Sequence, residues 1–85
     1  MYTLEISRQA ARALRQMGRI QAARIEAKLN ELARHPYAAH LDVERLQDRS
    51  GYRLRIGDWR VLYDIDDRLR GLSVEDVRQR GSAYR

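Results

Sequence analysis

The segment that decides the fold of this chain is Tyr52-Arg53-Leu54-Arg55-Ile56-Gly57-Asp58-Trp59-Arg60-Val61-Leu62-Tyr63. Apolar and charged residues alternate on both sides of Gly57-Asp58, which is typical of two antiparallel strands joined by a two-residue turn. A type II′ turn needs a positive φ at its first central position, and glycine supplies it. We therefore predict a β-hairpin in which Ile56 lies opposite Trp59.

This register fixes which side chains share a face, because directly opposed residues lie on the same side of a sheet. The face expected to be buried carries Tyr52, Leu54, Ile56, Trp59, Val61 and Tyr63. The other face carries Arg53, Arg55 and Arg60, with Arg55 opposite Arg60. Like charges in that position destabilise a sheet by about 0.2–1 kcal/mol, so the cluster favours an anionic ligand. The alternative is an ordinary solvated face whose arginines pair with nearby carboxylates such as Asp58, Asp64 and Glu75.

The composition points to a small basic protein with an anionic partner. The chain has 85 residues, 17 basic residues against 12 acidic ones and a net charge of +5, and Lys28 is its single lysine. Arginine suits bidentate contact with phosphate, so we expect nucleic acid or an acidic protein as partner.

A chain this short buries no large cavity, so any site is expected on an open face. The absence of cysteine, of a signal pattern and of a long apolar run predicts a cytoplasmic protein without membrane association.

The remaining sequence predicts an α+β fold in one domain, residues 1–85. The expected elements are a strand over 2–6, helices over 8–17 and 19–33, the hairpin, and a last strand over 69–77. Ser7 is a suitable N-cap for the first helix, and Pro36 ends the second. Glu75 and Asp76 interrupt the alternation of the last strand, which indicates a bulge or an early strand end. The order is strand, helical hairpin, then a three-stranded antiparallel meander, forming one curved sheet with both helices packed on one face.

Residues 37–50 are predicted to be a loop. His35 and His40 lie near the acidic pair Asp42 and Glu44, but their spacing matches no metal-binding signature. Solvated loop residues are the better interpretation. We predict neither a metal site nor a cofactor.

The residues now support a comparison with a known family. The order of elements, the segment 51–66 around the hairpin and the closing segment Val77-Arg78-Gln79-Arg80-Gly81-Ser82-Ala83-Tyr84-Arg85 resemble the RelE/ParE superfamily of bacterial toxins. The resemblance covers essentially the whole chain. Within it, the arginines and the terminal tyrosine favour the RelE-like branch.

A RelE-like toxin is implied to be an endoribonuclease, an mRNA interferase that enters the ribosomal A site, cleaves messenger RNA and inhibits translation. Carried over position by position, the resemblance implies site residues at Arg53, Arg55, Arg60, Arg80 and Tyr84. We predict catalytic roles for Arg55, Arg60, Arg80 and Tyr84, and RNA binding by Arg53, Arg78 and Arg85. Cleavage by the ribose 2′-hydroxyl needs in-line geometry and stabilisation of phosphorane charge, which arginines supply. Some relatives have lysine at the two positions before the turn. Arginine is a poor proton acceptor, so the general base is not identified, and ribosomal RNA is expected to complete the site.

The sequence is also compatible with two other functions. A ParE-like toxin inhibits DNA gyrase through the same scaffold without hydrolysis, and a non-catalytic RNA-binding module would show salt-sensitive binding without toxicity. Either toxin implies a cognate antitoxin whose acidic segment folds on the basic surface. Operator DNA is expected to be bound only indirectly, through that antitoxin.

Overall fold

The computed structural model describes residues 1–81, which form five strands and two helices. In chain order they are β1 (Thr3–Ile6), α1 (Arg8–Gln16), α2 (Arg19–Arg34), β2 (Val43–Arg45), β3 (Tyr52–Ile56), β4 (Trp59–Asp66) and β5 (Gly71–Gln79). The predicted α+β class is confirmed. Neither helix in this part of the chain has the length and apolar character needed to cross a bilayer.

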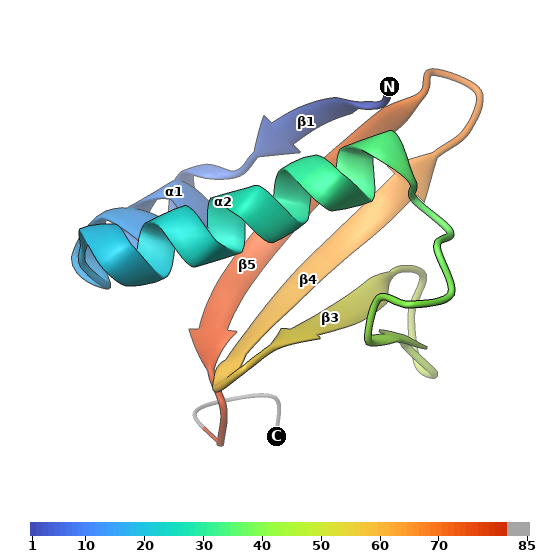
Figure 1. The fold of residues 1–85 in the computed structure, drawn as a ribbon. Helices are drawn as coiled ribbons and strands as arrows, with labels where there is room; N and C mark the ends of the chain where they lie inside the picture. Colours follow the sequence, from blue (N-terminus) through green and yellow to red (C-terminus); the bar gives the residue numbers. More distant parts are fainter. Residues whose placement is uncertain (82–85) are drawn as a thin grey trace.

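The strands form one sheet in the order β1-β5-β4-β3-β2. Strand β1 is parallel to β5, and the other neighbours are antiparallel. Figure 1 shows both helices on one face, with α2 running across β5 and β4. We call the opposite face of the sheet the outer face.

The core lies between the helices and the sheet. Leu54, Val61 and Val77 form one cross-strand row, and all three are buried. Ile25 and Leu29 of α2 are buried in the same cluster. Burial of one such aliphatic side chain stabilises the folded state by about 1.5–3 kcal/mol. The apolar face of the hairpin therefore packs in the core, and its charged face points outward.

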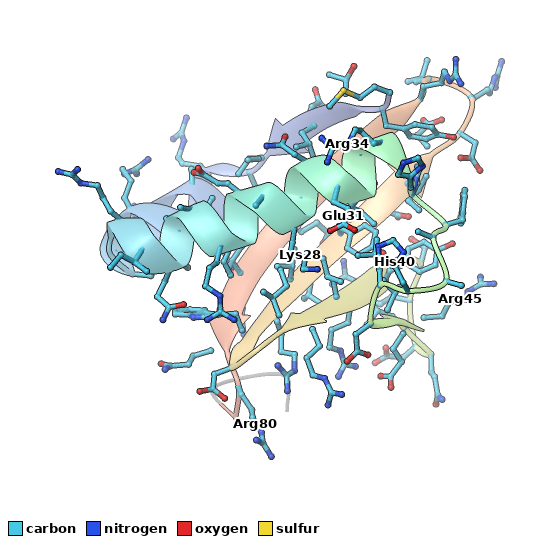
Figure 2. The ribbon with its side chains drawn as sticks, viewed as in Figure 1. Lys28, Glu31, Arg34, His40, Arg45 and Arg80 are labelled. Carbon is cyan, nitrogen blue, oxygen red and sulfur yellow. The ribbon has the colours of Figure 1, made fainter. Side chains whose placement is uncertain are left out.

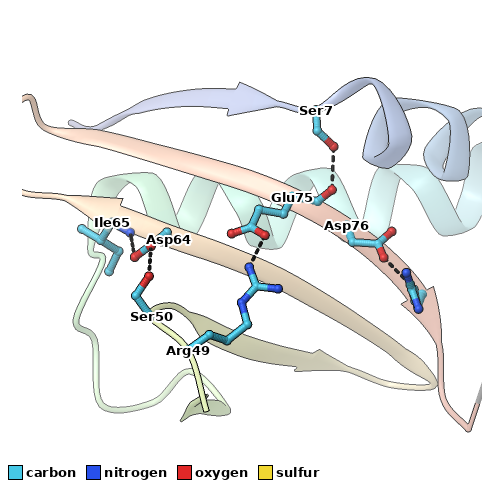
Figure 3. Close-up of polar contacts among 8 residues, drawn as sticks. Ser7, Arg49, Ser50, Asp64, Ile65, Glu75 and Asp76 are labelled. Carbon is cyan, nitrogen blue, oxygen red and sulfur yellow. Dashed lines mark hydrogen bonds and ion pairs between the residues drawn. The ribbon is translucent and has the colours of Figure 1, made fainter. Parts of the chain in front are cut away.

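Ser7 fixes the start of α1 on the sheet. Its side-chain oxygen accepts a hydrogen bond from the Ala10 N–H at 3.0 Å, and its hydroxyl donates to the Glu75 carbonyl of β5 at 2.6 Å, as drawn in Figure 3. The predicted N-cap is therefore confirmed, and the cap also ties the helix to the last strand.

The predicted hairpin register is confirmed pair by pair, including Ile56 opposite Trp59 and Arg55 opposite Arg60. Gly57 has a φ of 57°, as the first central residue of a type II′ turn requires. Within residues 1–81 the only non-glycine residue with positive φ is Arg70, so Asp58 has the negative φ of the second position.

The expected count of four strands was wrong, because the predicted loop contains a fifth. Strand β2 has three residues, and it pairs Val43 with Leu54 and Glu44 with Arg53. Three residues are too few to show a period of two in sequence. The strand forms because β3 offers it an edge.

The predicted irregularity in the last strand is a β-bulge. The register of β4 against β5 shifts between Leu62 and Tyr63, which leaves Glu75 as the extra residue. Strict alternation would place Asp76 in the core. The bulge instead puts Val77 in the core and Asp76 opposite Leu62, on the outer face.

Candidate nucleic-acid interface

Three arginines from three neighbouring strands form a row across the outer face. Arg60 of β4 lies opposite Arg55 of β3 on one side and opposite Arg78 of β5 on the other. We call these residues the arginine row. The hairpin alone determines the first pair, whereas the second also depends on the bulge, which turns Arg78 outward. Three like charges in line are unfavourable without anions.

A hollow of about 290 Å³ opens on the outer face beside this row, and it is lined by Arg53, Arg55, Arg60, Asp42 and Glu44. The structure thus brings together the three hairpin arginines that the sequence singled out. Three guanidinium groups against two carboxylates leave a surplus of positive charge. The hollow is open to solvent and suits a phosphate group better than an apolar ligand.

Each hairpin arginine is oriented by a different acceptor. Arg55 donates from Nε to Oδ2 of Asp42 at 2.7 Å, and Arg53 Nη2 lies 3.5 Å from Oε1 of Glu44. Arg60 donates from Nη1 to the carbonyl oxygens of Gly57 and Trp59, both at 2.9 Å. Exposed ion pairs contribute at most about 1 kcal/mol, so a phosphate can compete with the carboxylates.

Arg78 is oriented by a buried carboxylate. Its Nε donates to Oδ2 of Asp76, while Oδ1 of Asp76 accepts the backbone N–H of Val77 at 2.9 Å. In Figure 3 a dashed line marks this contact at the labelled Asp76. Both oxygens of the carboxylate are therefore engaged, one by the bulged backbone and one by the arginine.

Arg80 lies at the end of the row, beside the hairpin turn. Its backbone N–H donates to the Asp58 carbonyl at 2.6 Å, and its side chain is exposed. Figure 2 places it at the turn end of the sheet, away from Arg34. It does not line the hollow. Tyr84 and Arg85 lie outside the described residues.

The carboxylates beside the arginines differ from those expected from sequence. In the alternative of an ordinary solvated face, the hairpin arginines were expected to pair with carboxylates such as Asp58, Asp64 and Glu75. Glu75 instead pairs with Arg49, and Asp64 accepts from Ser50. The acceptors in place are Asp42, Glu44 and Asp76. The signal that could have found them is the acidic pair Asp42 and Glu44, which alternates with the same period as Arg53 and Arg55. It can be interpreted only once β2 is recognised as a strand.

A second polar cluster lies at the opposite end of the sheet. The hydroxyls of Tyr2 and Tyr37 each donate to the Asp67 carboxylate at 2.6 Å. These bonds hold the pKa of Asp67 below its usual range and raise the pKa of Tyr37 to about 12. The guanidinium of Arg70 lies 5.9 Å from the centre of the Tyr2 ring. We call Tyr2, Tyr37 and Asp67 the tyrosine clasp.

The histidine considered for metal binding has a different partner. His40 contacts the Glu31 carboxylate of α2, and this hydrogen bond, helped by Lys28, lowers the pKa of Glu31. Figure 2 shows Lys28, Glu31 and His40 together beside α2. Within residues 1–81, no group of three or more potential metal ligands is close enough to hold an ion.

Several solved structures that are similar to this fold are RelE toxins or complexes of RelE. A chain of the archaeal RelE–RelB complex from Pyrococcus horikoshii OT3 superposes with a TM-score of 0.83 at 26% identity, covering 96% of this chain and 98% of that chain. For the RelBE2 toxin–antitoxin complex from Mycobacterium tuberculosis the TM-score is 0.74 at 30% identity, with 93% and 98% covered. The isolated E. coli RelE toxin shares the fold, with a TM-score of 0.79 at 18% identity and 99% and 89% covered. No curated protein sequence matches the chain significantly.

By its fold, the chain is therefore a toxin of the RelE-like kind. Residues 4–84 match the family described as "ParE toxin of type II toxin-antitoxin system, parDE". The chain belongs to this family, within the RelE/ParE superfamily that the sequence resembled.

Proposed function

We propose that this chain is the toxin of a type II toxin–antitoxin pair and acts as a RelE-like endoribonuclease that cleaves messenger RNA in the ribosomal A site. The observation that supports the proposal is the open hollow lined by Arg53, Arg55 and Arg60. It continues into Arg78 along the arginine row. Guanidinium groups aligned on three neighbouring strands match the regular spacing of charges along a phosphodiester backbone, and arginine binds phosphate through two parallel hydrogen bonds.

The proposed cleavage is an in-line displacement at phosphorus. The ribose 2′-hydroxyl gives up its proton as its oxygen bonds to phosphorus, the bond to the 5′-oxygen breaks, and the leaving oxygen takes up a proton from solvent. The products are a 2′,3′-cyclic phosphate and a 5′-hydroxyl. Arg55 and Arg60 grip the non-bridging oxygens and stabilise the developing charge. Arg80, beside the turn, stabilises the leaving oxygen, and Tyr84 stacks on a base or orients the attacking hydroxyl.

Proton abstraction is assigned to the ribosomal complex rather than to a hairpin side chain. Arg53 and Arg55 cannot be deprotonated at physiological pH. Catalysis by this chain then relies on positioning and on electrostatic stabilisation, which together supply large rate effects without an internal base. No step of the proposed reaction uses a metal ion.

A cognate antitoxin is the proposed partner that controls this activity. Two of the similar solved structures are complexes of a toxin with its antitoxin. An acidic segment that folds on binding would neutralise the surplus charge of the hollow. We place its carboxylates near Arg53, Arg55, Arg60 or Arg80. Contact with operator DNA is proposed to occur only through the antitoxin.

Purified toxin in a translation reaction tests the proposal. Cleaved messenger ending in 2′,3′-cyclic phosphate is the expected result. Arg60→Ala is expected to lower the cleavage rate by about 100-fold. Arg12→Ala, which removes an exposed arginine of α1, is the matched control with wild-type cleavage. Absence of cleavage by the wild type, or equal cleavage by Arg60→Ala, contradicts the proposal.

Inhibition of DNA gyrase is the second candidate, favoured by the ParE description of the family that residues 4–84 match. The same preparations are tested for inhibition of gyrase supercoiling. Inhibited supercoiling together with intact messenger RNA would assign the chain to the ParE-like activity. The arginine hollow would then be a surface for protein contact.

A further inference from the structure

We propose that Asp76 is the positioning residue of the arginine row: through the β-bulge it fixes Arg78 as a permanent phosphate contact, whereas Asp42 holds Arg55 only until a phosphate displaces it. This inference rests on the proposed RNA-binding function and assigns the two ends of the row different roles. Asp76 was noticed in sequence only because it interrupts an alternating strand.

The two ion pairs differ strongly in burial. The Asp76 side chain is 8% exposed and that of Arg78 is 34% exposed. In the pair at the other end of the row, Asp42 is 57% exposed and Arg55 is 59% exposed. Water and salt screen an exposed pair, so its partners exchange readily. A buried carboxylate instead needs its hydrogen bonds and keeps them.

The bulge places the Asp76 carboxylate on the outer face, opposite Leu62, where two hydrogen bonds hold it. Oδ1 of Asp76 accepts the N–H of Val77, and Oδ2 accepts Nε of Arg78. The carboxylate is thus fixed to the backbone of the strand that carries Arg78. Arg60 lies opposite Arg78 on the neighbouring strand, so this carboxylate fixes one end of the arginine row.

Asp76→Asn and Asp42→Asn test the assignment because each removes one negative charge beside one end of the row. If net charge alone governed binding, both variants would bind RNA more tightly. Positioning predicts opposite signs. Asp76→Asn keeps an acceptor for the Val77 N–H but sets an amide group against Arg78, so binding of single-stranded RNA weakens about fivefold. Asp42→Asn frees Arg55 and tightens binding about twofold.

Two further variants separate positioning from a general structural effect. Glu75→Gln removes the neighbouring carboxylate of the bulge, which pairs with Arg49, and is expected to leave RNA affinity unchanged. In an Arg78→Ala background, Asp76→Asn is expected to have no further effect on affinity. Tighter or unchanged binding by Asp76→Asn, or an equal loss in the Arg78→Ala background, overturns the proposal.

A measurement on the free wild-type protein distinguishes failure of this inference from failure of the proposed function. The Nε–H of Arg78 is expected to exchange with water more slowly than the Nε–H of Arg55, as observed by NMR of the arginine side chains. Equal or faster exchange at Arg78 overturns the positioning role even if RNA is bound and cleaved. Slow exchange in a protein that binds no RNA supports the positioning and refutes the proposed function.

Discussion

The two ends of the sheet hold their charges in opposite ways. At the hairpin end, three arginines lie in a row and the carboxylates of Asp42 and Glu44 are exposed. At the other end, the tyrosine clasp surrounds one carboxylate, that of Asp67, with two hydroxyl donors. The clasp joins the amino-terminal segment, the loop after α2 and the β4–β5 turn. We propose that the clasp stabilises the fold, whereas the arginine row keeps its unfavourable charge in order to bind an anion.

The largest expected effect separates the two ends by activity. Arg60→Ala should lower the rate of messenger cleavage by about 100-fold, because it removes a donor to the phosphorane. Its free energy of unfolding should stay within about 1 kcal/mol of wild type, since the change also relieves repulsion with Arg55. Initial cleavage rates and urea unfolding measure both. An Arg60→Ala variant that is destabilised but fully active would contradict the role in activity that we assign to this end of the sheet.

The clasp should show the reverse pattern. Asp67→Asn weakens the hydrogen bonds from Tyr2 and Tyr37 by removing the charge that strengthens them. A lower free energy of unfolding with an unchanged cleavage rate is expected. Initial cleavage rates and urea unfolding test this prediction. A loss of cleavage without a loss of stability would show that the clasp belongs to the site.

The pH dependence of stability follows from the clasp. The pKa of Asp67 is depressed in the folded state, so its contribution is present above the ordinary value of 3.8 and is lost as pH falls through the folded pKa. The pKa of Tyr37 is raised, so its contribution is complete below 10 and is lost as pH rises toward about 12. A residue-resolved NMR titration of the tyrosine rings should find Tyr37 ionising late, and Asp67→Asn should lower the pKa of Tyr37. If the pKa of Tyr37 is equally high in Asp67→Asn, Asp67 is not the cause of the shift.

Salt dependence sharpens the comparison further. Each arginine that neutralises a phosphate of single-stranded RNA contributes about 0.7 to the slope of log affinity against log salt. Arg78→Ala should therefore reduce the slope by about that amount. Arg70→Gly is the matched control at the clasp end, because it removes one positive charge at a φ of 54°, which glycine adopts without strain. Equal reductions would mean that RNA is held by net charge rather than by the row.

The smallest effect is expected in the core between the two ends. The hydroxyl of Tyr63 is buried and has no hydrogen-bond partner among residues 1–81. Burial raises its pKa far above the ordinary value. Tyr63→Phe should therefore match wild type or exceed its stability by up to about 1 kcal/mol. A clear loss of stability in urea would reveal a partner for the hydroxyl.

The hairpin was predictable because local chemistry determines it. Gly57 fixes the turn, and the register then places Arg53, Arg55 and Arg60 on one face. The helices followed in the same way from Ser7, from the apolar spacing and from Pro36. Each of these features depends on residues close together in sequence, which is the information that a single sequence contains.

The partners of the arginines were not predictable because they depend on pairing between distant segments. Asp42 and Glu44 reach the hollow through β2, a strand that exists only against the edge of β3. Asp76 reaches Arg78 because the bulge moves Val77 into the core. Sequence alternation located the irregularity near Glu75, but it could not show which side chain the shift would turn outward.

The most direct test of the central claim is NMR mapping of a short single-stranded RNA that carries a 2′-deoxy substitution at the cleaved position. The RNA then binds without being cut. Perturbed side-chain signals of Arg55, Arg60 and Arg78, with Tyr2 and Tyr37 unaffected, are the predicted result. Perturbations at the tyrosine clasp with an unaffected arginine row would contradict the account.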